Sequence, residues 1–211
     1  KGGSVYLEVP SGINQYKGKF TIDSCIFERN YGYRGASIYF NQEHLKVGEM
    51  ISRPLLPIQI KNSIFKENKQ ILGEESQPYK GGAIFLNFQD ITKSEEEDCI
   101  VDIDNCTFEN NAAIEGGLIA IYQSYEDNKK RKILKVFPIQ IKNCIFKKSK
   151  STVYGGAIYM NFEYYDGTDD FIEIENCNFE GCESSGSGGS VYINQQNIDF
   201  IKSKITNSTF K

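Results

Sequence analysis

The chain has 211 residues, 39% of them hydrophobic, and its 24 basic and 28 acidic residues give a formal net charge of −4. The charges are mixed along the sequence with no concentrated basic face, which argues against nucleic acid as a partner. No apolar run approaches the roughly 20 residues that a membrane-spanning helix needs, so no membrane span is expected within this segment.

The first predicted element of each repeat is a β-strand that opens with glycine, and it occurs six times. The copies span Gly2–Leu7, Gly35–Phe40, Gly81–Leu86, Gly116–Ile121, Gly155–Met160 and Gly188–Ile193. Val5, Ile38 and their equivalents form a β-branched column, and a second apolar column lies two residues further on. Side chains alternate between the two faces of a strand, so both columns are expected to point inward. The position between them is mostly aromatic and is expected to point outward.

A second predicted strand follows, with apolar residues at alternate positions. Its inner column is Ile22, Ile60, Ile103, Ile141, Ile174 and Ile205. The alternation slips by one residue at Ser24, Asn62, Asn105, Asn143, Asn176 and Asn207. Asparagine tolerates the left-handed backbone conformation that turns a corner, so a bend is expected there. A short third strand then carries phenylalanine at positions 27, 65, 108, 146, 179 and 210.

Repeats of 31 to 46 residues that never close on themselves indicate an array built by stacking. Three short strands per repeat with bends between them are typical of a parallel β-helix, and the crossover rule for parallel strands makes it right-handed. The sequence therefore predicts an all-β fold, a right-handed parallel β-helix (solenoid) of about six rungs. Residues 1–211 are expected to form a single β-helix segment, a fragment of a longer repeat protein, because the chain begins and ends inside a motif.

Charged residues on the expected outer face alternate in sign from one repeat to the next. One column reads Asp23, Lys61, Asp104, Lys142, Glu175 and Thr206, and another reads Glu28, Lys66, Glu109, Lys147, Glu180 and Lys211. In-register stacking places equivalent residues about 4.8 Å apart, where opposite charges attract and like charges repel. The alternation therefore indicates that the repeats stack in register.

Four of the six cysteines share one repeat position, directly after the predicted bend. They are Cys25, Cys106, Cys144 and Cys177, and the other two repeats carry Ser63 and Ser208 there. Their spacing matches no zinc-binding pattern. A column of small buried thiols is the favoured interpretation. Disulfides between neighbouring rungs are the alternative, because the strand spacing falls within the Cα separation of a disulfide. Interchange with serine argues against an obligatory bond.

The glycine strand and the phenylalanine strand each contain a recognisable short motif. GGAI stands at Gly81–Ile84 and Gly155–Ile158, and FxxN stands at Phe27–Asn30, Phe65–Asn68 and Phe108–Asn111. Their alternation resembles the repeats of the chlamydial polymorphic membrane proteins and of related pectin-lyase-like right-handed β-helices. The resemblance covers the whole chain and implies a right-handed β-helix in an adhesin-like or cell-surface protein. The asparagine bend is similar to the asparagine ladder of pectate lyases.

Many β-helices cleave polysaccharides, and such sites need carboxylates on one outer face that bind calcium or act as acid and base. The candidates are Asp102, Asp104, Glu173 and Glu175. Lys142 lies between Asp104 and Glu175 in the alternating column, so a structural account already explains these residues. The sequence therefore predicts no catalytic residue, no metal site and no cofactor.

The outward aromatic column is the candidate surface for glycans or another partner. It contains Tyr6, Tyr39, Phe85, Tyr159 and Tyr192. Stacked tyrosines offer flat apolar faces with polar tips, which suit a sugar ring. The alternative is that the long loops fold back and cover the column. The asparagine bends at 62, 105, 143, 176 and 207 and the four aligned cysteines are interpreted as structural ladders.

Together these features predict a structural or adhesive segment of a large cell-surface or extracellular filament protein, without catalysis. The expected partners are other protein chains, through flanking repeats or through end-to-end or lateral assembly, and glycans. The competing hypotheses are a polysaccharide-binding module and a pectate-lyase-like carbohydrate-active enzyme.

Overall fold

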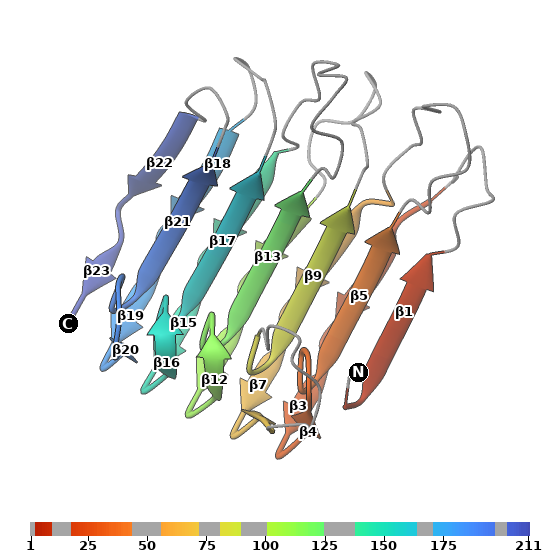
Figure 1. Cartoon of the computed structure of the whole chain (residues 1–211), viewed down its shortest axis with the longest axis horizontal. Helices are drawn as coiled ribbons and strands as arrows, with labels where there is room; N and C mark the ends of the chain where they lie inside the picture. The colour runs from red at the N-terminus through yellow and green to blue at the C-terminus, as the bar shows by residue number, and fades with distance from the viewer. Residues whose placement is uncertain are drawn as a thin grey trace.

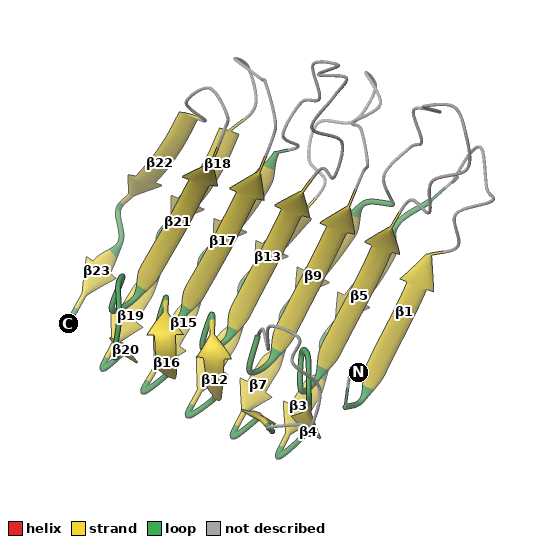
Figure 2. Cartoon of the chain, viewed as in Figure 1, coloured by secondary structure: helices red, strands yellow, loops and turns green. Residues whose placement is uncertain are grey.

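The computed structural model describes residues 3–9, 18–43, 56–71, 81–89, 101–124, 138–163, 171–196 and 202–211. Within these ranges the regular structure consists of strands, which form four parallel sheets (Figure 1; Figure 2). The described part of the chain contains no helix that is long and apolar enough to cross a membrane. The fold is a right-handed parallel β-helix of six rungs, as the sequence predicts.

Each sheet collects the equivalent strand of successive rungs. Sheet A contains β1 (Val5–Val9), β5 (Ile38–Glu43), β9 (Ile84–Gln89), β13 (Ile119–Ser124), β17 (Ile158–Glu163) and β21 (Val191–Gln196). Sheet B contains β2 (Phe20–Asp23), β6 (Ile58–Lys61), β10 (Val101–Asp104), β14 (Ile139–Lys142), β18 (Phe171–Glu175) and β22 (Lys202–Thr206). Sheet C contains β3 (Ile26–Glu28), β7 (Ile64–Lys66), β11 (Thr107–Glu109), β15 (Ile145–Lys147), β19 (Asn178–Glu180) and β23 (Thr209–Phe210). Figure 1 shows the six strands of sheet A side by side, with the chain termini at opposite ends of the stack.

A fourth sheet corrects the expectation of three strands per rung. Sheet D contains β4 (Tyr31–Gly32), β8 (Lys69–Gln70), β12 (Ala112–Glu115), β16 (Lys150–Tyr154) and β20 (Glu183–Ser184). Three of these strands are only two residues long, so they carry no alternation of apolar and polar residues that a sequence pattern can reveal. The sheet is also irregular, because its register shifts between Ala113 and Glu115.

The interior is filled by ladders of like side chains. The predicted isoleucine column of sheet B is confirmed, since Ile22, Ile60, Ile103, Ile141, Ile174 and Ile205 pair in that order. The phenylalanine column of sheet C stacks ring on ring, with centroids 4.7–5.0 Å apart and interplanar angles of 3–8°. The inner columns of sheet A join the same core. Burial of this continuous apolar column is the main source of stability.

The asparagine bends are confirmed as corners between sheets B and C. Ser24 and the five asparagines after it in the column all have φ between 50° and 54°. A second corner, between sheets C and D, has the same backbone conformation and was not predicted. It is formed by Arg29, Glu67, Asn110, Lys148 and Gly181, with φ between 49° and 59°. These mostly charged residues give no sequence signal for a left-handed bend.

The glycine pairs mark the tight turn into sheet A. Gly155 has φ of 56°, a conformation that glycine adopts without steric cost. A Cβ built at Gly156 would collide with the carbonyl oxygens of Gly189 and Glu183. The first glycine therefore supplies the backbone conformation, and the second supplies room for the neighbouring rung.

Candidate functional site

The carboxylates that the sequence singles out lie on the outer face of sheet B, beside lysines. Asp104 is opposite Lys61 on one side and Lys142 on the other, as the alternating column predicts. The closest ion pair of Lys61 is nevertheless diagonal, with Nζ 3.1 Å from Asp102 Oδ2. The face is thus a network in which acidic and basic side chains neutralise one another.

Lys142 is the centre of the best-connected part of this network. Its Nζ lies 2.9 Å from Glu173 Oε2 and 3.8 Å from Glu175 Oε2. The hydrogen bond from Lys142 lowers the pKa of Glu173, and the same bond raises the pKa of Lys142. Glu173 is therefore held as a carboxylate, which is the opposite of what a general acid needs. Among the described residues, no group of three or more His, Cys, Asp or Glu side chains is placed to hold a metal ion.

Reversal of one charge tests whether this network fixes the stacking. We expect Lys142→Glu to lower the free energy of unfolding by about 1–2 kcal/mol at low salt, because the new carboxylate would face Asp104, Glu173 and Glu175. Added salt should recover much of the loss. Lys148→Glu is the matched control, since Lys148 is exposed and lies between Asn110 and Gly181 of the neighbouring rungs. Equal losses in both variants at every salt concentration would contradict the proposed role of the network.

The predicted asparagine ladder at the first corner exists and is exposed to solvent. The side-chain nitrogen of Asn105 donates to Asn62 Oδ1 over 2.8 Å, and that of Asn176 donates to Asn143 Oδ1 over 3.3 Å. Asn143 donates to Asp104 Oδ1 over 2.7 Å, which links the ladder to the charged column. Asn207 has the same left-handed conformation in the last rung. This ladder ties neighbouring rungs together at their surface.

A second asparagine ladder lies in the interior of the β-helix and is formed by the asparagines of the FxxN motif. Asn111 Oδ1 accepts hydrogen bonds from both the backbone and the side-chain nitrogen of Asn68, each 2.9 Å long. Asn68 Oδ1 receives the same pair from Asn30, at 3.0 and 2.9 Å. Asn68 and Asn111 are at most 1% exposed. The sequence motif was the signal for this ladder, although its burial and bonding were not predicted.

The cysteine column is also confirmed as a ladder, and its described cysteines are free thiols. Cys106, Cys144 and Cys177 are buried, whereas Cys25 in the first rung is half-buried. Each thiol sulfur lies within hydrogen-bonding distance of the carbonyl oxygen two residues before it, with Sγ–O distances of 3.0–3.3 Å. Ser63 makes the equivalent bond and accepts a hydrogen bond from the backbone nitrogen of Cys25. Serine and cysteine are interchangeable here because both satisfy the same backbone groups.

The aromatic column points away from the core, as predicted, but the interpretation of it as an exposed glycan surface is wrong for its central members. Tyr39, Phe85 and Tyr159 are only 2–5% exposed, so a sugar ring cannot reach their faces. They form a second apolar cluster outside sheet A. Tyr6, at the first rung, is 38% exposed, and Tyr192, in the last rung, is half-buried.

Tyr122 and Tyr154, from outside the column, add to this outer cluster. Ala120 interrupts the column, and Tyr122, two residues further on, fills the gap with edge-on contacts to Phe85 and Tyr159. Tyr154, at the end of β16, stacks on Tyr159 with centroids 5.8 Å apart. The outward face of sheet A is therefore a second small core, which the period of alternation alone does not reveal.

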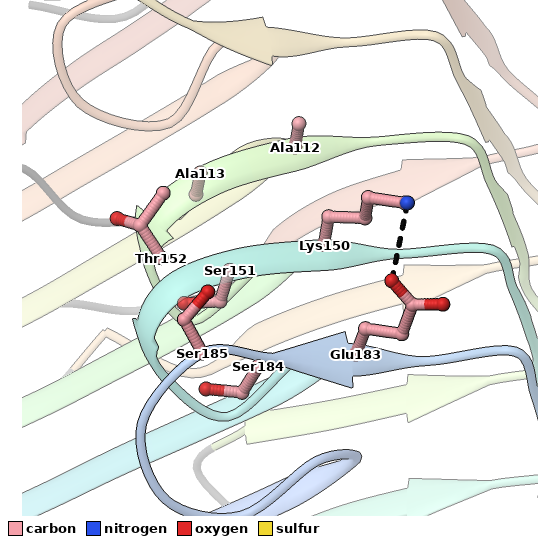
Figure 3. Close-up of a pocket in the computed structure, with 8 residues that line it drawn as sticks. All are labelled: Ala112, Ala113, Lys150, Ser151, Thr152, Glu183, Ser184 and Ser185. Atoms are coloured by element: carbon pink, nitrogen blue, oxygen red, sulfur yellow. Dashed lines mark ion pairs between the residues drawn. The ribbon is translucent and has the colours of Figure 1, made fainter.

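A shallow polar depression lies on sheet D, with a volume of about 560 Å³ (Figure 3). It is lined by Ala112, Ala113, Lys150, Ser151, Thr152, Glu183, Ser184 and Ser185. Lys150 and Glu183 form an exposed ion pair of 3.1 Å across it. Ser184 donates its hydroxyl proton to Val153 O, and Ser151 Oγ lies within hydrogen-bonding distance of Ile114 O, so these hydroxyls hold the backbone.

Comparison with protein-family models, with curated proteins and with solved structures finds no match to this chain. Its function is therefore argued from the arrangement of its own residues.

Proposed function

We propose that this chain is a structural or adhesive segment of a large cell-surface or extracellular filament protein, and that it acts as a stiff rod without catalysis. We place it, by its GGAI and FxxN motifs, with the pectin-lyase-like β-helices of the chlamydial polymorphic membrane protein type. Its partners are other protein chains. The rod would carry binding regions away from a surface or join repeats in a filament.

One observation carries this proposal: many outward polar side chains of sheet B and its corner bond to those of neighbouring rungs, along the rod axis. Lys142 binds Glu173 and Lys61 binds Asp102, so the most prominent carboxylates serve to join neighbouring rungs. The exposed asparagines add amide bonds in the same direction. Six parallel rungs joined both inside and outside resist bending, which suits a spacer better than a site that must accommodate a substrate.

Surface labelling tests the proposal directly. Antibodies raised against the folded chain are applied to intact cells that make the parent protein, and to the same cells after permeabilisation. We expect the antibodies, detected by immunogold labelling, on the outside of intact cells or on material extending from them. Label that appears only after permeabilisation would contradict the proposal.

The competing enzyme hypothesis has its own test. We expect no release of reducing ends or unsaturated products from polygalacturonate or other uronic-acid polysaccharides, with or without added calcium. Asp102, Glu173 and Glu175 are paired with lysines, and Asp104 accepts a hydrogen bond from Asn143. Asp104→Ala is the control for any trace activity. Product release by the native chain that disappears in this variant would overturn the assignment.

A further inference from the structure

Three consecutive rungs place a cysteine at the same buried position. Cys106, Cys144 and Cys177 are 1–2% exposed and follow the corner between sheets B and C in rungs three, four and five. The rungs are bonded at these residues, since Cys106 O accepts from Ile145 N and Cys144 O accepts from Asn178 N, both over 2.9 Å. The thiols therefore stand in a line along the rod axis.

The middle thiol contacts both of its neighbours. The side chain of Cys144 lies within hydrogen-bonding contact of those of Cys106 and Cys177. Adjacent strands of a sheet are about 4.8 Å apart, inside the roughly 4.4–6.8 Å Cα separation of a disulfide. Cys25 differs, because the next rung offers it Ser63. Only the three central cysteines have cysteine neighbours in this column.

We propose that Cys106, Cys144 and Cys177 form an oxidisable site in which a peroxide couples Cys144 to one of its two neighbours. Because Cys144 is the common partner, each molecule gains one disulfide between adjacent rungs and keeps one of the outer thiols. This inference does not depend on the function proposed above.

The chemistry distinguishes the outer thiols from the middle one. The hydrogen bond with Cys144 lowers the pKa of Cys106 and of Cys177, whereas its contact with Cys106 raises the pKa of Cys144 well above the usual value. An outer cysteine is therefore the more readily formed thiolate, the form that attacks an oxidant.

The reaction balances in two steps. The thiolate sulfur attacks one peroxide oxygen and breaks the O–O bond, which gives a sulfenic acid and, after protonation of the leaving hydroxide, one water. The sulfur of Cys144 then loses its proton and attacks the sulfenic sulfur, forming the S–S bond as the S–O bond breaks and a second water leaves. Two thiols lose two electrons, and the peroxide is reduced to two waters.

The test is treatment of the folded 211-residue chain with hydrogen peroxide, followed by alkylation of the remaining thiols after unfolding and by peptide mass mapping. We expect a mass loss of two hydrogen atoms and a peptide containing Cys144 linked to one containing Cys106 or Cys177. The circular dichroism spectrum should stay that of the folded chain.

Serine variants make the assignment specific, and Ser63 shows that serine fits this column. Cys144→Ser should lose the disulfide completely. Cys106→Ser should retain a disulfide between Cys144 and Cys177. Cys177→Ser should retain one between Cys144 and Cys106. Cys25→Ser is the matched control and should behave as the native chain.

Four results would overturn the proposal. The first is a disulfide that persists in Cys144→Ser, and the second is a disulfide that links any other cysteine. The third is a disulfide that forms only after the β-sheet circular dichroism spectrum is lost. The fourth is oxidation to sulfinic or sulfonic acids without a disulfide.

Discussion

Replacement of Ile103 by alanine is expected to lower the free energy of unfolding by about 2–5 kcal/mol. Ile103 is fully buried, and it stands between Ile60 and Ile141 in the isoleucine column. The backbone on both sides is fixed by sheet pairing, so the structure cannot easily collapse into the cavity that the missing atoms leave. Denaturant unfolding monitored by circular dichroism measures the change.

Ile205→Ala is the matched control, because Ile205 is the last member of the same column and is 45% exposed. We expect it to cost less than about 1 kcal/mol, since little apolar surface is lost and no cavity forms. Equal costs at both positions would mean that the column is not a continuous core.

The isoleucine column could be predicted from the sequence because the rungs stack in register. In a parallel β-helix, equivalent residues become spatial neighbours, so a repeated residue type such as the isoleucine at 22, 60 and 103 reports directly on packing. The corner at Asn62 was predictable for a related reason, because the alternation slips at a residue type that tolerates positive φ.

Other parts of the fold depend on contacts that no single repeat reveals. The corner at Glu67 or Lys148 uses residues with no preference for a left-handed bend, so sheet D after it was not predicted. The outer aromatic cluster also includes contacts from Tyr122 and Tyr154, which come from different positions in the repeat. Alternation assigns a residue to a face of a strand, but whether that face is exposed depends on what packs against it.

The structure also shows that the true repeat contains two rungs. An inner column of sheet A reads Val9, Gln42, Phe88, Gln123, Phe162 and Gln195 in order of pairing. Glutamine occurs in the rungs that carry Lys61 and Lys142, and apolar residues occur in the rungs with acidic outer columns. The inner column and the outer charged column therefore alternate with the same period of two rungs. The charge alternation read from the sequence is the outer half of this pattern.

Replacement of Asn111 by alanine is expected to be among the most damaging single changes, with a loss of about 3–5 kcal/mol in the free energy of unfolding. Asn111 Oδ1 accepts two hydrogen bonds from Asn68, and its side-chain nitrogen donates to Phe65 O over 2.9 Å. Truncation leaves the buried backbone nitrogen of Asn68 without this acceptor, and the Asn68 side-chain nitrogen keeps only its bond to Phe27 O. Denaturant unfolding measures the loss.

Asn105→Gly provides the control, because it removes an asparagine from the exposed ladder and keeps the left-handed backbone, where φ is 51°. Water replaces the lost amide contact at the surface, so we expect a change of no more than about 1 kcal/mol. A larger loss for Asn105→Gly than for Asn111→Ala would reverse the argument. It would mean that the exposed corner ladder, rather than the buried asparagines of the FxxN motif, contributes most to holding neighbouring rungs together.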